Sequence, residues 1–311
     1  MELGNFTTVT EFILVGLPNH RKTQLLLFVM ILIIYLLTIV GNLIIILLVQ
    51  TDSRLHTPMY FFLTQLSGVE ICYVTSTLPQ MMVHLLAGNG TITFTHCAAQ
   101  MYMILSMGSA ECFLLGVMAY DRYLAICRPL LYAVAMNRWC QMELAVACWA
   151  GAFLCSVIYM GCTYCHPFCG PNHINHFICE LPVVLKLACA DTHLTEAIIF
   201  WEAAMILLGP LFVILTSYGL ILSSVLKMRT TAGRQKVFTT CASHLLVVTV
   251  FYGTVGAVYM VPQSGTAPDH GKQISVFYIV ITPLLNPIIY TLRNKDVHGA
   301  VTRLLQRQRV G

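Results

Sequence analysis

The stretch LLLFVMILIIYLLTIVGNLIIILLV, residues 25–49, contains no Asp, Glu, Lys or Arg. A helix crosses the hydrocarbon core of a bilayer with ~20 mostly apolar residues. A membrane-spanning strand is different, because it needs only about 9–11 residues and alternates in polarity. The stretch therefore predicts a transmembrane helix.

Six further stretches have the same character, each with at most one acidic residue once the stretch 141–163 is trimmed to begin at Leu144. They cover residues 58–86, 98–120, 141–163, 197–226, 237–261 and 273–292. The whole chain is 58% hydrophobic and 10% charged, with a mean hydropathy of +0.77, whereas soluble domains carry about a quarter charged residues. We expect an all-α membrane protein whose single transmembrane domain, residues 25–292, is a bundle of seven helices.

Basic residues predict the orientation of this bundle, because they concentrate on the cytoplasmic side. With residues 1–24 placed outside, the outer segments hold four of the 17 Lys and Arg residues and the inner segments hold thirteen. We therefore expect an extracellular N-terminus, a long extracellular loop at 164–196 and a cytoplasmic tail at 293–311. These bases are spread over three inner loops and the tail, which disfavours binding of nucleic acid. The tail has apolar residues at helical spacing between basic ones, which predicts a short amphipathic helix lying on membrane lipid.

The predicted outer side carries two further kinds of signal. Asn5-Phe6-Thr7 is an acceptor for N-linked glycosylation. Five cysteines belong to the outer segments, where disulfides are favoured: Cys97, Cys165, Cys169, Cys179 and Cys189. Spacing alone leaves their pairing open. A metal site at His173, His176 and Cys179 is the alternative use of the same loop.

Ionisable residues inside a membrane are costly and face the bundle interior. Glu70 and Glu111 lie in the middle of the second and third spans, where both cannot stay charged without a counter-charge. One interpretation is a Na⁺ site or a shared proton, with Asn42 and Asn286 nearby. The other is a pair of protonated acids that hydrogen-bond as structural groups. No other cofactor is expected.

Two motifs lie near the predicted inner ends of spans. Asp121-Arg122 lies at the inner end of the third span. It is either an ordinary ion pair at the membrane interface or a contact between helices that can open. The segment NPIIY, residues 286–290, places a proline kink beside a buried Asn and a Tyr. It serves either as a plain kink or as a movable joint.

Several motifs together resemble the signature of vertebrate olfactory (odorant) receptors, which are rhodopsin-like G-protein-coupled receptors. They are LHTPMYFFLTQLS (55–67), MAYDRYLAICRPLLY (118–132), SY (217–218), KVFTTCASHL (236–245) and PLLNPIIYTLRNKDV (283–297). The resemblance implies disulfides between Cys97 and Cys179 and between Cys169 and Cys189, and it favours the Na⁺ site over structural acids.

The same resemblance implies a set of switch residues that couple to a G protein. They are Asp121, Arg122, Tyr123, Tyr218, Asn286, Pro287 and Tyr290. The partner implied is a heterotrimeric G protein of the stimulatory olfactory type, which raises cyclic AMP. The expected location is the plasma membrane.

By resemblance, a small and mostly apolar odorant binds between the outer halves of four helices. The implied wall is Ile104, Leu105, Gly108, Ser109, Cys112, Glu202, Met205, Ile206, Tyr252, Val255, Gly256, Tyr259, Val276 and Ile279. Glu202 could hold an amine or a hydroxyl donor of a ligand, or it could reach the headgroups or cap a backbone group.

An enzyme is not expected, because Ser243 and His244 are adjacent on a helix and point apart. A small-molecule transporter is one alternative function, although the two halves of the chain show no internal repeat. A receptor that no longer signals is the other alternative.

Overall fold

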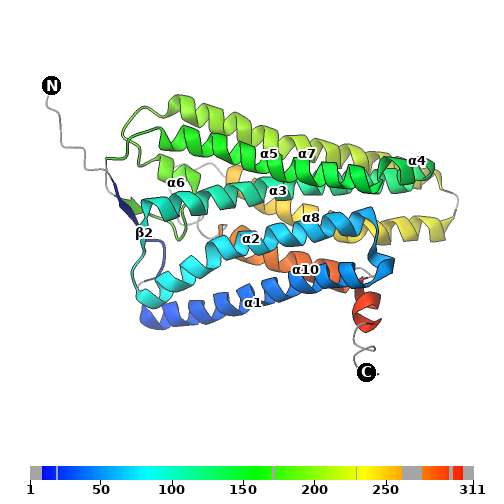
Figure 1. The fold of residues 1–311 in the computed structure, drawn as a ribbon, viewed down its shortest axis with the longest axis horizontal. Coiled ribbons are helices and arrows are strands. Elements are labelled where there is room, and N and C mark those ends of the chain that lie inside the picture. The colour runs from blue at the N-terminus through cyan, green and yellow to red at the C-terminus, as the bar shows by residue number, and fades with distance from the viewer. Residues whose placement is uncertain are drawn as a thin grey trace.

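Long helices running side by side make up most of the molecule (Figure 1). The computed structural model describes residues 9–18, 20–169, 172–228, 230–260, 275–293 and 297–303. Six uninterrupted long helices are α1 (Arg21–Thr51), α2 (Pro58–Ala87), α3 (Phe94–Cys127), α5 (Arg138–Tyr164), α7 (His193–Lys227) and α8 (Thr231–Met260). The seventh predicted span is helical over residues 275–293, as the π-helix η2 (Phe277–Ile281) followed by α10 (Thr282–Arg293). All seven predicted spans are therefore helical over their described residues.

The helices extend past the apolar runs from which they were predicted, and polar residues set where they begin. The Thr93 hydroxyl accepts from the backbone N–H of His96 at 3.2 Å and caps α3. The Asn137 side chain accepts from the backbone N–H of Cys140 at 3.0 Å and caps α5. Such caps satisfy amide groups that have no partner within the helix. These two helices thus start several residues before their apolar cores.

Short helices connect the long ones. They are η1 (Ser53–Leu55), α4 (Pro129–Ala135) and α6 (Leu181–Leu185). Residues 297–303 are also helical, with Val297 and Ala300 buried, and the Arg303 guanidinium pairs with the Asp52 carboxylate at 2.6 Å. The predicted helix after the seventh span is therefore present, and it is tied to the end of α1.

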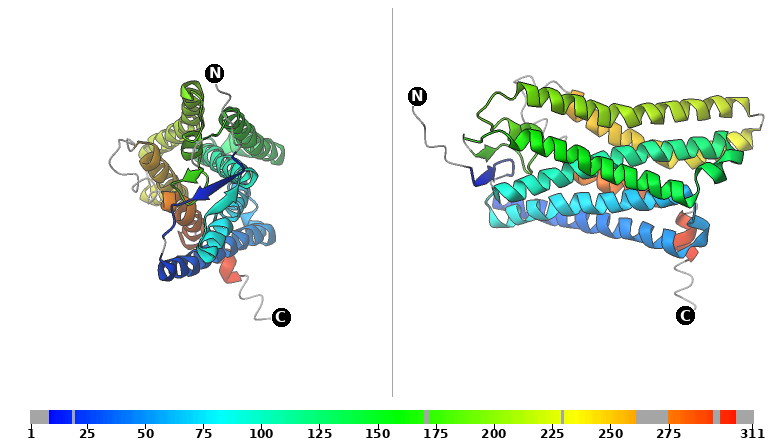
Figure 2. Two further views of the ribbon diagram at one scale, coloured as in Figure 1. Left: turned by 90° about the vertical axis from the view of Figure 1, so that its left-hand side faces the viewer. Right: turned by 45° about the horizontal axis from the view of Figure 1, so that its top comes forward.

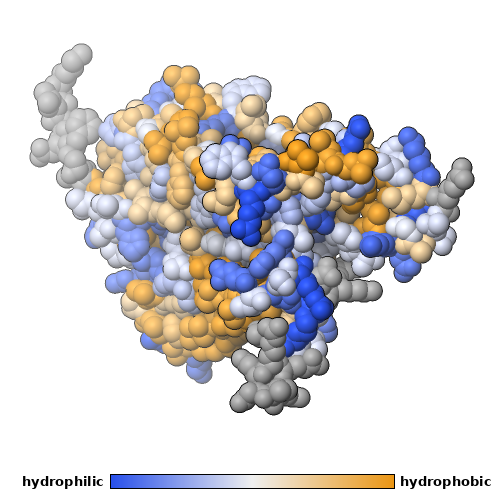
Figure 3. Space-filling view, turned by 45° about the vertical axis from the view of Figure 1, so that its right-hand side comes forward, coloured by the Kyte–Doolittle hydropathy of each residue, from blue (hydrophilic) through white to orange (hydrophobic). Residues whose placement is uncertain are grey.

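Apolar side chains cover much of the flank of the bundle (Figure 3). Leu26 on α1, Leu154 on α5 and Phe212 on α7 are 62%, 65% and 71% exposed. Among the described residues, five helices are long and apolar enough to cross a membrane: α1, α3, α5, α7 and α8. The apolar part of the last helix, Phe277–Thr291, is shorter. A flank this apolar is suited to hydrocarbon rather than to water.

A three-stranded sheet at one end of the bundle was not predicted. It consists of β1 (Glu11–Leu14), β2 (Thr91–Thr93) and β3 (His173–Ile174), in the order β2-β1-β3. The strands lie across the end of the ring of helices (Figure 2). β1 is antiparallel to β2 and parallel to β3, and the Phe12 side chain is fully buried beneath it. We call this the lid end of the bundle and the opposite end, which carries α4, the Arg122 end.

Two disulfides fix the loop at the lid end. Cys179 bonds to Cys97 in the first turn of α3, with the Cα atoms 5.5 Å apart. Cys169 bonds to Cys189 within the loop, with the Cα atoms 5.8 Å apart. Both pairs that the family resemblance implied are present, and Cys165 is unpaired and exposed. The alternative metal site is wrong, because the sulfur of Cys179 is already bonded to Cys97.

Close packing of backbones joins the first and last helices. A Cβ atom added at Gly41 on α1 would lie 3.1 Å from Cβ of Pro287 on α10. That approach is tighter than ordinary van der Waals contact, so glycine is what allows α1 to reach the proline kink. At Gly161 on α5, by contrast, an added Cβ meets nothing within 4 Å.

We predict that Gly41→Leu destabilises the bundle by about 1–3 kcal/mol, the usual cost of overpacking a core. The melting temperature of the purified protein in detergent would measure the loss. Gly161→Leu is the matched control, since it makes the same change in open space. Equal melting temperatures for the two variants would show that the α1–α10 contact does not limit stability.

Candidate functional site

The acid and base at the end of α3 form one closed cluster. Arg122 Nη2 donates to Asp121 Oδ2 at 2.8 Å, and Arg122 Nε donates to the same oxygen at 3.2 Å. Asp121 is fully buried and the Arg122 side chain is 12% exposed. A buried charge of this kind depends on its partner, because removing one member leaves the other unsolvated.

Tyr132 on α4 completes the coordination of this carboxylate. Its hydroxyl donates to Asp121 Oδ1 at 2.8 Å, so both carboxylate oxygens have donors. Burial and the neighbouring Asp121 raise the pKa of Tyr132 well above its usual range, which keeps the phenol as a donor. α4 is therefore held against α3 by the same group that holds Arg122.

Three other helices meet around the guanidinium. The Tyr218 hydroxyl of α7 shares a 2.7 Å hydrogen bond with Nδ1 of His244 on α8, and the two rings stack with centroids 5.8 Å apart. The Tyr290 hydroxyl of α10 is buried without a hydrogen-bond partner in the described structure, within electrostatic reach of Arg122. Tyr123 is half-buried on α3. The structure thus gathers Asp121, Arg122, Tyr218 and Tyr290 from three helices, α3, α7 and α10.

The two acids predicted inside the bundle meet at Asn286. The Asn286 amide donates to Glu111 Oε1 at 3.2 Å and also to Glu70 Oε1. Glu70, Glu111 and Asn286 are 1%, 8% and 2% exposed. Asn286 lies one residue before Pro287, so the acid pair contacts the predicted joint directly. Asn42 is buried as well, but its amide donates to Thr38 within its own helix, at 3.0 Å.

This site fits a hard cation such as Na⁺. Oxygen atoms are the ligands that such ions prefer, and the two carboxylates bring negative charge. Oδ1 of Asn286 is a buried acceptor without a hydrogen-bond donor among the described residues. Glu70, Glu111 and Asn286 come together from α2, α3 and α10, respectively.

A polar contact at the lid end joins the loop to the seventh helix, and it was not predicted. The Tyr278 hydroxyl on η2 donates to Glu180, which directly follows Cys179. Nε2 of His176 lies 3.8 Å from the other Glu180 oxygen and 3.3 Å from the Ser275 hydroxyl. We call Glu180, His176, Ser275 and Tyr278 the lid contact. The signal that the sequence offered was an acid next to a loop cysteine, Glu180 after Cys179.

Comparison with known proteins gives one result over nearly the whole chain. A sequence model of the family described as olfactory receptor matches residues 31–308. Olfactory receptor 2G3 of Homo sapiens is 48% identical over 306 residues, which cover 98% of this chain and 99% of that protein. Olfactory receptor 5T7 of Mus musculus is 45% identical and covers 98% of this chain and 99% of its own length. The chain belongs to the olfactory receptor family.

The fold of this olfactory receptor is that of a seven-helix G-protein-coupled receptor. The crystal structure of squid rhodopsin superimposes with a TM-score of 0.75 at 16% identity, covering 94% of this chain and 90% of that chain. The receptor is accordingly a multi-pass protein of the plasma membrane, and it is not an enzyme.

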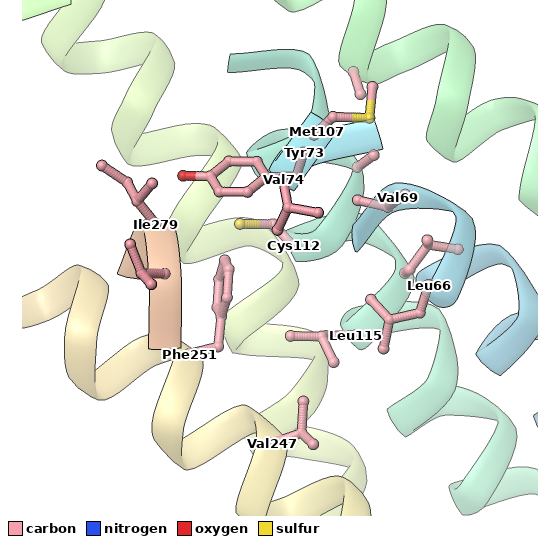
Figure 4. Close-up of a cluster of buried hydrophobic side chains, with 14 of the residues drawn as sticks. Leu66, Val69, Tyr73, Val74, Met107, Cys112, Leu115, Val247, Phe251 and Ile279 are labelled. Atoms are coloured by element: carbon pink, nitrogen blue, oxygen red, sulfur yellow. The ribbon is translucent and has the colours of Figure 1, made fainter. Parts of the chain in front are cut away.

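Four residues of the implied ligand wall, Ser109, Cys112, Ile206 and Ile279, are buried between the helices. Cys112, Phe251 and Ile279 face one another in a cluster of buried side chains (Figure 4). Ser109 and Ile206 are 6% and 8% exposed. A Cβ added at Gly108 or Gly256 meets nothing within 4 Å, so open space lies beside both glycines.

The other wall residues divide into two groups. Ile104, Leu105, Tyr252 and Val255 are half-buried in the bundle. The Tyr252 hydroxyl donates to the Leu207 carbonyl at 3.4 Å and thereby links α8 to α7. Val276 is 39% exposed at the edge of the seventh helix. The side chain of Tyr259 lies outside the described residues.

Two predicted wall residues point elsewhere. Met205 is 74% exposed on the flank of α7, so its place in the wall is wrong. The helical period turns it away from its neighbour Ile206, which is buried. The carboxylate of Glu202 is shielded from solvent and interacts with the Cys155 thiol on α5. It therefore lies on the α5 side of α7, and its contact with an amine ligand stays a prediction.

We predict that the lid contact weakens as the pH rises from about 5 to about 8. Burial raises the pKa of Glu180 to about 8, so the closed lid holds a proton that an opened, solvated Glu180 would release. Because the closed lid binds more protons, its stability falls with rising pH until Glu180 is ionised in both states. The melting temperature of the purified receptor at each pH would measure this.

Glu180→Gln is the control for this titration, because its amide fills the same space and stays neutral. The decline between about pH 5 and pH 8 should shrink in this variant. An unchanged pH profile would assign the decline to other groups.

Proposed function

We propose that this odorant receptor binds a small, mostly apolar molecule between α3, α7, α8 and the seventh helix and activates a stimulatory olfactory-type G protein, raising cyclic AMP. The observation that carries the proposal is the closed Asp121–Arg122 pair, with Tyr132 on one side and Tyr218 and Tyr290 on the other. Four elements meet at one guanidinium, so a shift of any of them changes its surroundings.

The ligand would gain most of its binding energy from burial. The wall is apolar apart from a few groups, among them the Ser109 hydroxyl and the Tyr252 phenol. Burial contributes about 25 cal/mol per Å² of apolar area, so a small odorant gains only a few kcal/mol. Affinity in the micromolar range or weaker follows from that magnitude.

The orientation that we propose places the lid end outside the cell and the Arg122 end in the cytosol. Thirteen of the 17 basic residues then lie on the cytosolic side, in agreement with the positive-inside rule. The glycosylation acceptor at Asn5 would be outside, although residues 1–8 are not among those described.

α4 offers a contact for the G protein beside the Arg122 cluster. Leu130 and Val134 are 97% and 70% exposed, and Tyr132 between them is bonded to Asp121. Apolar side chains exposed at the rim of the bundle suit an apolar pocket on a partner. Binding there would pull on α4 and, through Tyr132, on the carboxylate that holds Arg122.

Na⁺ bound by Glu70, Glu111 and Asn286 would supply positive charge to the acid pair in the resting receptor. The two carboxylates and the orphaned Asn286 oxygen support this proposal. Since Asn286 precedes Pro287, its position is coupled to the bend of the seventh helix.

We predict that Arg122→Gln abolishes most odorant-driven cyclic AMP production. A hydrogen bond to a charged group contributes about 1.5–3 kcal/mol, so the loss of Arg122 contacts should reduce the response about tenfold or more. A cyclic-AMP reporter assay with an odorant panel, normalised to receptor at the cell surface, would measure it. Arg54→Gln changes an exposed arginine at the same end and should respond like the parent.

The same assay distinguishes the alternative functions. Odorant-driven flux without a G protein would indicate a transporter, and silence of the parent across the panel would indicate a receptor that no longer signals. A full response from Arg122→Gln would refute the role of Arg122.

We predict that Glu111→Gln removes stabilisation by Na⁺ and raises basal signalling. At a hundredfold excess over its dissociation constant, a bound ion stabilises the folded receptor by about 2.7 kcal/mol. Melting temperatures in sodium and in choline chloride would measure this stabilisation. Glu196→Gln, at an exposed acid of α7, should keep the sodium effect. Unchanged basal and ligand-driven signals in Glu111→Gln would rule out the ion as a holder of the resting state.

A further inference from the structure

A cavity of about 600 Å³ opens on the flank of the bundle between α3, α5 and α7. Both α5 and α7 pack along α3, but they contact each other at few positions, which leaves the gap. The residues on which the argument rests are Gly116 and Tyr120 of α3, Ala147 of α5, and Met205, Gly209 and Val213 of α7. We call this cavity the flank crevice. Its volume lies within the range of about 300–1,000 Å³ that holds small molecules.

Small residues and a proline create the crevice. A Cβ added at Gly116 would lie 3.1 Å from Cβ of Pro210, so glycine lets α7 approach α3 at its kink. One residue before that proline, a Cβ added at Gly209 meets nothing within 4 Å. The crevice therefore exists because Gly209 and Ala147 line it with little or no side chain, and larger side chains at these positions would fill it.

The crevice faces hydrocarbon and is separate from the proposed odorant site. Met205, Val213 and Tyr120 are 74%, 39% and 42% exposed on the flank of a plasma-membrane protein. On α3, the crevice residues recur at helical spacing on one face, whereas Ser109 and Cys112 are buried toward the bundle interior. A molecule in the crevice must therefore enter from the bilayer.

The crevice is polar at one end only. Tyr120 directly precedes Asp121 at the Arg122 end, and its phenol can donate or accept a hydrogen bond. Tyrosine at such a depth suits the membrane interface, where its hydroxyl meets the headgroups. Phe113, at the other end of the α3 face, lies seven residues away, about 10 Å along the helix axis. Met205 supplies a flexible apolar surface on α7.

This polarity matches a lipid with one hydroxyl and a rigid apolar body. In the leaflet at the Arg122 end, such a molecule points its hydroxyl toward the headgroups and its hydrocarbon toward the bilayer centre. A rigid ring system loses less conformational entropy on binding than a flexible acyl chain. We propose that the flank crevice binds a membrane sterol, with its hydroxyl at Tyr120 and its rings against Gly209 and Ala147.

Photolabelling of the full-length receptor in membranes tests the proposal. The probe is a cholesterol analogue that carries a diazirine on its ring system, and the labelled receptor is purified and digested for mass spectrometry. We expect labelled peptides from the crevice faces of α3, α5 or α7, with labelling suppressed by excess unlabelled cholesterol. Labelling that excess cholesterol does not suppress, or labelling confined to other helices, would overturn the proposal.

Two variants with matched controls locate the sterol. Gly209→Trp fills the crevice and should reduce the labelling at least about tenfold, equivalent to about 1.4 kcal/mol. Gly219→Trp makes the same change at an exposed glycine of α7 with open space beside it and should label like the parent. Tyr120→Phe keeps the ring and removes the hydroxyl, so labelling should need about fivefold more probe, equivalent to about 1 kcal/mol.

Gly209→Trp could fail to reach the membrane. Tyr120→Phe leaves the packing intact, so it tests the proposal in that case as well. Parent-like labelling in Tyr120→Phe would refute the hydroxyl contact, and parent-like labelling in a folded Gly209→Trp would refute the site. A phospholipid with a diazirine on its acyl chain provides the second arm. If it labels the crevice as strongly and displaces the sterol probe, the occupant is an acyl chain and the sterol proposal is wrong.

Discussion

A peptide group in hydrocarbon has no water to bond, so every backbone N–H and C=O in a membrane span must find its partner within the protein. The seven long helices of this receptor meet that requirement. It also explains how polar side chains are tolerated along them. Hydroxyls of Thr38, Ser106 and Ser156 donate to carbonyls one turn earlier on their own helices, at 2.8–2.9 Å. Prolines lie inside α2, α7 and α10, at Pro79, Pro210 and Pro287, and the seventh helix includes a π-helical turn at Phe277–Ile281.

Polar groups that cannot be satisfied locally are gathered on the inside. Glu70 and Glu111 share the Asn286 amide, and the Tyr290 phenol lies within electrostatic reach of both acids and of Arg122. A chain of polar groups therefore runs from the middle of the bundle to the end of α3. The residues in this chain come from α2, α3 and α10, so the relative positions of these helices and the local electrostatics are coupled. This is a physical basis for transmitting a change in helix packing over distance.

The sequence was sufficient to predict the seven helices, because each depends on the length and polarity of one segment. It was also sufficient to bring Asp121 and Arg122 together, since they are adjacent. Contacts between segments far apart in the sequence were harder to predict. Pairing of β1 with β3 depends on a short, half-polar segment near the N-terminus that has no distinctive pattern. The contact of Tyr278 with Glu180 required knowing how the loop folds back over the seventh helix. Met205 was misplaced because a helix rotation of one residue decides whether a side chain faces the interior or the membrane.

β1 also imposes an order on biosynthesis. The Asn172 side chain donates at 2.9 Å to the backbone carbonyl of Glu11, 161 residues earlier in the chain. The N-terminal segment leaves the ribosome first, and β2 follows after the second long helix, yet β3 appears only after the fourth long helix. During that interval the backbone groups on the β3 side of β1 must be bonded to water or to other proteins. The nascent receptor therefore carries an unpaired strand edge through much of its insertion, and this edge is a site where a chaperone could act or where assembly could fail.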